Sequence, residues 1–292
     1  VLYRRERIET PDGDFLDLDW ADKGHDKVAI LSHGLEGSSR GQYVRGQVNS
    51  LNQAGWDCVA WNCRGCSGEI NRQKRLYHSG SSDDLGTVVE HVRKVRPGAP
   101  LALIGYSLGG NMTLKYLGEQ GEAAAHVIRG AVAFSVPCDL ASSSKVLARL
   151  SNSLYMIRFM VALRDKVRVK ERMFTGQAKG FSLWRIRTFK AFDDAYTAPI
   201  HGFSSAEDYW MRASSKPFLP MIRVPTLLVQ AQDDPFLAPP CYPYQEAQDS
   251  RWLHLEVPRY GGHGGFVSNP YYSDRRAAEF LSSIPPSRSG IR

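Results

Sequence analysis

The sequence Leu101-Ala-Leu-Ile-Gly-Tyr-Ser-Leu-Gly-Gly110 joins an apolar, strand-like run to a helical segment over residues 110–119. The pattern Gly-x-Ser-x-Gly, formed by Gly105, Ser107 and Gly109, lies between them. In a strand–turn–helix context, such a serine projects its hydroxyl above a sheet as a nucleophile. Both glycines are expected because a side chain at either position would clash with the neighbouring strand and helix. The pattern therefore predicts a reactive Ser107 at the end of a buried strand.

Short apolar runs of this kind alternate with helical segments along most of the chain. Strands are predicted at 15–20, 28–31, 58–61, 101–104, 130–134, 226–229 and 252–257, and helices at about 44–54, 82–95, 110–119 and 273–283. Runs that are apolar throughout and separated by helices are typical of a parallel sheet covered on both faces. The pattern predicts an α/β fold with a mostly parallel central sheet flanked by helices, whose ligands bind at the carboxyl ends of the strands.

The stretch 139–220 breaks this alternation, because it contains no convincing strand and indicates several helices. Its first part carries an apolar stripe formed by Leu147, Leu150, Leu154, Ile157, Met160 and Val161. The plain interpretation is that the stripe packs on the main core, and the more specific one is a cap that shapes a substrate pocket. Strands before and after the stretch supply parts of one site. We therefore predict a single domain over 1–292 with a helical cap inserted at 139–220.

A serine hydroxyl is a weak nucleophile without a neighbouring base. His263, in the glycine-rich loop Tyr260-Gly-Gly-His-Gly-Gly-Phe266, follows the last predicted strand and can approach Ser107. An acid is expected after the preceding strand, where Asp233 and Asp234 are adjacent, and the resulting order is serine, acid, histidine. We predict Asp234 as the acid, since such acids commonly precede a short segment ending in proline, and retain Asp233 as the alternative acid.

Two backbone N–H groups are needed to bind the oxyanion that forms in acyl transfer. One is expected from Leu108, directly after the nucleophile, and the other from Leu35, in the loop that follows the strand at 28–31. His33 and Gly34 would shape that loop. His33 could be mistaken for a second base, but we expect it to hold the loop through a hydrogen bond to the backbone.

These motifs together resemble those of the α/β-hydrolase fold, and more narrowly the YheT-like hydrolases of bacteria, which are related to the eukaryotic ABHD1/ABHD3-type proteins. The matching segments cover nearly the whole chain: 11–20, 33–38, 61–69, 77–80, 105–111, 192–194 with 197–199, and 233–236. The resemblance implies a serine hydrolase of carboxylic esters, acting on short- to medium-chain acyl esters or acylglycerols through an acyl-enzyme intermediate. Such a reaction needs no metal and no organic cofactor.

Two other functions use the same features. An acyltransferase would move the acyl group to an alcohol with the same three side chains, and a non-catalytic binding module would keep only the fold. The segment His78-Ser-Gly-Ser-Ser-Asp83 has the H-x4-D spacing of some acyltransferases. Because Ser81 to Asp84 also has the pattern of a capped helix start, we assign this segment a structural role.

Composition and charge limit the partners. The chain has 292 residues, 11% of them aromatic, and no low-complexity tract, which excludes a disordered protein. A net charge of +7 is too small to indicate nucleic acid, so the expected partner is a small-molecule or lipid-like ester. The stretch Arg164, Lys166, Arg168, Lys170, Arg172 predicts a solvated helix face, with weak contact to an anionic membrane surface as the alternative. Five cysteines and no secretory signal predict a reducing compartment and a cytoplasmic protein.

Overall fold

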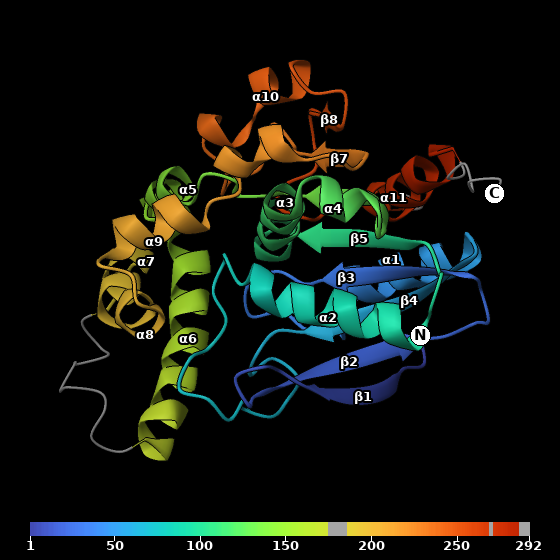
Figure 1. Cartoon of the computed structure of the whole chain (residues 1–292). Coiled ribbons are helices and arrows are strands. Elements are labelled where there is room, and N and C mark those ends of the chain that lie inside the picture. Colours follow the sequence, from blue (N-terminus) through green and yellow to red (C-terminus); the bar gives the residue numbers. More distant parts are fainter. Residues whose placement is uncertain (175–185, 269–270, 286–292) are drawn as a thin grey trace.

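The computed structural model describes residues 1–174, 186–268 and 271–285, and its centre is an eight-stranded sheet of order β1-β2-β4-β3-β5-β6-β7-β8 (Figure 1). The strands are β1 Arg4–Glu9, β2 Phe15–Ala21, β3 Lys27–Ser32, β4 Trp56–Asn62, β5 Leu101–Tyr106, β6 Ile128–Phe134, β7 Thr226–Val229 and β8 Leu253–Glu256. Strand β2 pairs antiparallel with both β1 and β4, and every other pair is parallel. The predicted α/β fold with a mostly parallel sheet is confirmed.

Helices cover both faces of the sheet, because alternate residues of the buried strands are apolar on both sides. In β3, Val28 and Ile30 belong to one core cluster, and Ala29 and Leu31 belong to the other. The first cluster includes residues of α2 Ser82–Val95 and α3 Leu108–Gln120, and the second includes residues of α1 Gln42–Gln53 and α11 Tyr272–Ser283. The short helices α4 Glu122–Ala125, η5 Pro239–Cys241 and α10 Tyr244–Gln248 lie in connections between strands.

Residues 139–221, called the insertion below, lie between β6 and β7, and their described part consists of helices joined by short connections. Its elements are α5 Leu140–Leu147, η1 Leu150–Asn152, α6 Ser153–Met173, α7 Phe189–Phe192, the π-helical η3 Asp193–Thr197, α8 Ala198–His201, α9 Ala206–Ala213 and η4 Lys216–Met221. Figure 1 shows the elements α5 to α9 beside the end of the sheet to which β3 and β5 point. The insertion therefore stands at the carboxyl ends of the parallel strands.

The apolar stripe predicted for the start of the insertion does not pack inward as a whole. The side chains that face outward are those of Leu150, Leu154, Ile157 and Val161, which are 92%, 80%, 59% and 49% exposed. The buried face of α6 instead consists of Met156, Met160, Leu163 and Val167. The prediction of inward packing is therefore wrong for four of the six stripe residues. Helix α6 is apolar on two faces, and periodicity alone does not tell which one is covered.

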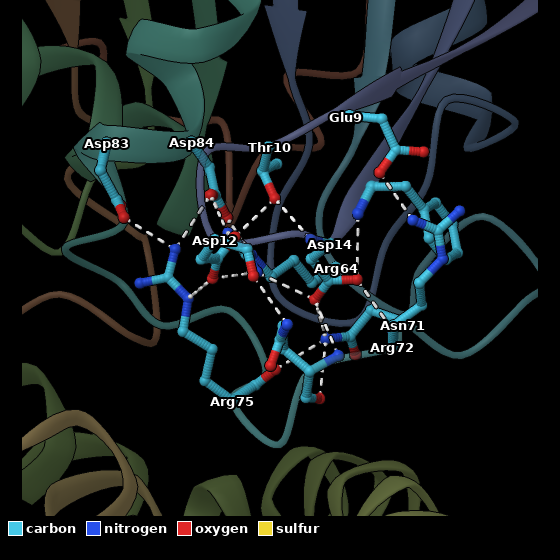
Figure 2. A network of polar contacts seen from close by, with 12 residues as sticks. Glu9, Thr10, Asp12, Asp14, Arg64, Asn71, Arg72, Arg75, Asp83 and Asp84 are labelled. Carbon is cyan, nitrogen blue, oxygen red and sulfur yellow. Dashed lines mark hydrogen bonds and ion pairs between the residues drawn. The ribbon is translucent and has the colours of Figure 1, made fainter.

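A buried network of charges joins loops at this end of the sheet (Figure 2). The Arg64 side chain, which follows β4 and is 1% exposed, donates hydrogen bonds to Asp12, Asp14 and Asp84 at 2.7–3.1 Å. Asn71 donates to Asp14 at 2.6 Å. The network thus fastens the β1–β2 turn and the start of α2 to the loop that follows β4.

Two lysines tie helix α6 to the rest of the fold. Lys170 is buried and donates to the backbone carbonyls of Asn71 and Gln73, and burial lowers its pKa to about 8. Lys166 donates to the Glu36 carboxylate at 2.9 Å. The predicted solvated basic face is therefore wrong for these two residues, because positions four apart lie on one side of a helix and this side faces the core.

We predict that Arg64→Met lowers the free energy of unfolding by about 3–5 kcal/mol, because it leaves Asp14 buried without its cationic partner and Asp84 paired only with Arg75. Urea titration followed by circular dichroism measures the loss. The control Arg72→Met removes an ion pair with Glu9 whose two side chains are 50% and 64% exposed, and should cost less than about 1 kcal/mol. Equal losses in the two variants would contradict a structural role for the buried network.

Candidate active site

Ser107 occupies a strained turn between β5 and α3. Its φ of +52° lies in the left-handed region that a non-glycine residue adopts only when the surrounding structure enforces it. The enforcement is steric: a Cβ at Gly109 would lie 2.3 Å from the carbonyl oxygen of Ser32, and a Cβ at Gly105 would lie 2.6 Å from that of Gly109. The Ser107 N–H also donates to the Phe134 carbonyl at 2.8 Å. β5, α3 and the neighbouring strand β6 thus hold Ser107 in a strand–turn–helix arrangement, as the sequence pattern predicts.

His263 links the Ser107 hydroxyl to a buried carboxylate. Its Nε2 lies 2.9 Å from Ser107 Oγ, and its Nδ1 lies 2.9 Å and 3.0 Å from the two carboxylate oxygens of Asp234. The Asp234 side chain is fully buried and accepts the N–H of Phe236 at 2.9 Å, and the Phe236 ring lies 4.2 Å from the imidazole. The structure therefore brings together the three predicted residues, 156 and 29 positions apart in the chain, as nucleophile, base and acid require.

Asp233, the alternative acid, has a different position. Its Oδ1 accepts the N–H groups of Gly261 and Gly262, each at 2.8 Å. These glycines begin the turn that presents His263, and Gly262 has a φ of +56°. Asp233 therefore shapes the histidine loop, while Asp234 contacts the imidazole.

Ser135 is a further support of the histidine loop that the sequence motifs did not reveal. Its hydroxyl accepts the N–H of Gly264 at 2.8 Å, and its own φ is +51°. It directly follows β6, and a small polar residue at the carboxyl end of a central strand is the signal by which it could have been found.

The loop after β3 approaches the nucleophile from the other side. A Cβ on Gly34 would lie only 3.4 Å from the Ser107 Cβ. The buried His33 ring accepts the Cys63 N–H at Nε2 and contacts the Gly34 carbonyl through Nδ1 at 2.7 Å, so Nδ1 carries the proton. His33 thus contacts backbone, as predicted. Leu35 and Leu108, the predicted sources of the two oxyanion donors, line the same cavity as Ser107.

This cavity lies between the sheet and the insertion, and its lining is mostly apolar. The loops around the sheet and the first residue of α3 contribute Leu35, Tyr77, Leu108, Pro137 and Phe236. The insertion contributes Leu140, Leu147, Phe159, Leu163, Phe189, Phe192, Tyr209 and Trp210. An apolar cavity with a few polar groups next to a reactive side chain is typical of a small-molecule site.

Asp193 is an ionisable group in this cavity that no sequence motif marked as a site residue. It begins the π-helix η3, a type of helix that is rare and frequent at functional sites. Its carboxylate accepts the Thr197 hydroxyl at 2.7 Å and the Trp210 indole N–H at 2.8 Å. Burial raises the pKa of Asp193 to about 7, although these two donors oppose the shift.

His78 also lines the cavity, but Asp83 pairs with Arg75 at 2.8 Å. Burial and the nearby His201 hold the pKa of His78 well below its usual range, so its ring is neutral at pH 7. Its Nδ1 accepts the N–H of Gly80, which fixes the turn before α2. Among the described residues, no group of three or more His, Cys, Asp or Glu side chains is arranged to hold a metal ion.

Comparison with known proteins finds a matching family model, related sequences and solved structures with the same fold. Residues 23–178 match the family model described as serine aminopeptidase, S33. YheT of Escherichia coli (strain K12), which is named as an esterase, is 34% identical over 90% of this chain and 78% of its own length. The phospholipase ABHD3 of Mus musculus is 30% identical over 97% of this chain and 72% of its own length. The solved Pyrococcus furiosus esterase Pf2001 covers 97% of this chain and 90% of its own, with a TM-score of 0.67 and 18% identity, which shows a shared fold.

The raised pKa of Asp193 predicts a dependence of stability on pH. Between its ordinary pKa of 3.8 and about 7, the folded protein holds a proton on this group that the unfolded chain has released. This group's contribution to the free energy of unfolding therefore falls as the pH rises from about 4 to 7. Asp193→Asn should gain stability relative to the wild type over that interval, as measured by urea unfolding at several pH values.

Asp194→Asn is the matched control. The Asp194 carboxylate is 40% exposed, and although burial opposes the shift, the Ala206 N–H and Lys190 lower its pKa. Its contribution to stability is therefore lost only below about pH 4, and the difference between Asp194→Asn and the wild type should change little from about pH 4 to 7. A difference between Asp193→Asn and the wild type that stays constant from pH 4 to 7 would show that Asp193 titrates alike in the folded and unfolded states.

Proposed function

The chain belongs to the family of α/β hydrolases that includes YheT and the ABHD3 phospholipases, and we propose that it cleaves carboxylic esters with Ser107, His263 and Asp234. It is an esterase- or lipase-like serine hydrolase of the carboxylic ester class. The observation that carries the choice of residues is the imidazole of His263, which lies within hydrogen-bond distance of both the Ser107 hydroxyl and the Asp234 carboxylate.

In the first half of the reaction, Ser107 Oγ attacks the carbonyl carbon of the ester while His263 Nε2 takes its proton. Asp234 accepts the Nδ1–H of His263, which orients the ring and stabilises the imidazolium. The N–H groups of Leu108 and Leu35 would donate to the oxyanion of the tetrahedral intermediate. The imidazolium then protonates the leaving alcohol oxygen, the C–O bond breaks, and the acyl group remains on Ser107.

In the second half, His263 takes a proton from water as the water oxygen attacks the acyl carbon. The same oxyanion donors stabilise the second tetrahedral intermediate. Its collapse returns the proton from His263 to Ser107 Oγ and releases the carboxylic acid. The two ring nitrogens of the histidine thus act separately, because Nε2 carries protons while Nδ1 stays bound to Asp234.

The insertion supports a lipid-like or medium-chain ester as substrate. It supplies aromatic and aliphatic side chains to the cavity beside Ser107, among them Phe159, Phe189 and Leu147. Each methylene of a substrate chain that such a wall removes from water contributes about 0.8 kcal/mol to binding. We therefore interpret residues 139–220 as a cap within a single domain over 1–292, shaping the pocket for the hydrophobic part of the ester.

The roles of the two adjacent acids give the sharpest test by substitution. Asp234→Asn should lower kcat/KM for p-nitrophenyl butyrate by about 10⁴-fold, and Ser107→Ala by at least as much. Asp233→Asn should lower it less than about tenfold, because an amide oxygen can still accept the N–H groups of Gly261 and Gly262. A loss in Asp233→Asn that matches Asp234→Asn would contradict the assignment of the acid.

Hydrolysis rather than transfer is the predicted outcome when water competes with an alcohol. Acyl transfer could use the same three side chains, but the pairing of Asp83 with Arg75 removes the support that the His78 motif offered. With p-nitrophenyl butyrate and about 1 M glycerol, we expect free butyric acid as the main product in mass spectrometry. Glyceryl butyrate in excess over the free acid would favour an acyltransferase.

A further inference from the structure

Four apolar side chains form a continuous outer stripe on the insertion: Leu150, Leu154, Ile157 and Val161. Their spacing of four, three and four residues places them on one face of a helix, and each is at least 49% exposed. The opposite face of α6 is buried, so the helix does not need this stripe to pack on the fold. A contiguous exposed apolar surface of this kind marks a site of interaction.

The charges near the outer stripe are mostly basic, and the acidic residue one turn beyond Val161, Asp165, forms an ion pair with Arg168. From Leu140 to Arg164 the sequence contains four basic residues and no acidic one; the basic residues are Lys145, Arg149, Arg158 and Arg164. Arg149 and Arg158, which are exposed, flank the stripe. Exposed apolar residues bordered by arginine and lysine match the two layers of a phospholipid surface, with acyl chains below and anionic head groups above.

The helix that carries the outer stripe also borders the cavity. Tyr155, 46% exposed, packs its ring 4.8 Å from that of Phe236, which contacts His263. Phe159, one turn further along α6, lines the cavity. Figure 1 shows α6 at the edge of the molecule, with the sheet on its other side. Helix α6 therefore carries both the outer stripe and aromatic side chains that reach the cavity beside Ser107.

We propose that the outer stripe, with Arg149 and Arg158, seats this protein on the surface of a bilayer that contains anionic phospholipid. No single helix of the described residues is long and apolar enough to cross a membrane, whereas α5 and residues 150–173 pass that test only as a pair bent by 84°. A bent, one-sided pair suits a position in the interface plane. This docking surface differs from the basic stretch at 164–172, in which Lys166 and Lys170 face the core.

Sedimentation with vesicles tests the proposal. The wild-type protein should bind vesicles of phosphatidylcholine with about 30% phosphatidylserine, more weakly at about 0.5 M than at about 0.1 M salt, and should bind pure phosphatidylcholine less. Leu154→Glu/Ile157→Glu should lower the partition coefficient at least tenfold, because it removes apolar contact and adds repulsion. Both positions are exposed, so the thermal midpoint should stay within a few degrees of the wild type.

Two controls separate this proposal from others. Val95→Glu alters an exposed apolar residue at the end of α2, away from the cavity, and should leave vesicle binding unchanged. Ser107→Ala should lose hydrolysis and keep vesicle binding, so failure of the proposed reaction and failure of the docking surface are distinguishable.

Equal vesicle binding by the wild type and Leu154→Glu/Ile157→Glu would overturn the proposal, as would a wild type that does not bind anionic vesicles. Light scattering after size-exclusion chromatography tests the other possible partner of the stripe, which is a second copy of this chain. A wild-type dimer that the double variant converts to a monomer would assign the stripe to contact between copies of this chain, and would also overturn it.

Discussion

The close approach of β5, α3 and the loop after β3 is the constraint on which the site depends. Room for this approach exists only because Gly105 and Gly109 lack side chains. It forces Ser107 into a left-handed conformation that costs about 1–3 kcal/mol, and the surrounding sheet supplies that energy through its packing. The remaining site residues come from loops at the same edge, because the parallel strands β3, β5, β6, β7 and β8 all end there.

Helix α6 links the edge of the sheet that carries Ser107 to the outside of the molecule. One face packs on the aromatic cluster of the cavity, and its C-terminal half is fixed by Lys166 on Glu36 and by Lys170 on backbone carbonyls. Glu36 follows Leu35 in the loop proposed to bind the oxyanion, and its N–H is held by the Tyr77 hydroxyl. The wall of the pocket and the loop that contains Leu35 are therefore joined by the Lys166–Glu36 ion pair. The opposite face of α6 remains exposed.

Much of this arrangement could be predicted from the sequence, because its strongest signals are local. The alternation of apolar runs with helices indicates the sheet, and the glycines around Ser107 and His263 mark turns that other residues cannot form. Strand β1 was not predicted, because an edge strand with the sequence Arg-Arg-Glu-Arg-Ile-Glu has no apolar alternation. Its charge is compensated across the hairpin, where Arg5 and Arg7 pair with Asp19 and Asp17 of β2.

Other features depend on tertiary contacts that no local pattern contains. The outward face of α6 is as apolar in sequence as the inward one, and only packing distinguishes them. The raised pKa of Asp193 requires burial by elements far apart in the chain, and the support from Ser135 requires β6 to end beside the histidine loop. The three side chains that meet at Ser107 could therefore be predicted from the sequence more completely than the residues that position them.

Labelling with a fluorophosphonate, followed by peptide mapping in the mass spectrometer, tests whether Ser107 is the activated nucleophile. The probe phosphonylates a serine only when a base removes its proton and donors stabilise the developing oxyanion. We expect one adduct in the folded protein, on Ser107, that is lost in His263→Ala. An unlabelled Ser107 in protein that still hydrolyses esters, or an adduct on another residue that abolishes the activity, would contradict it.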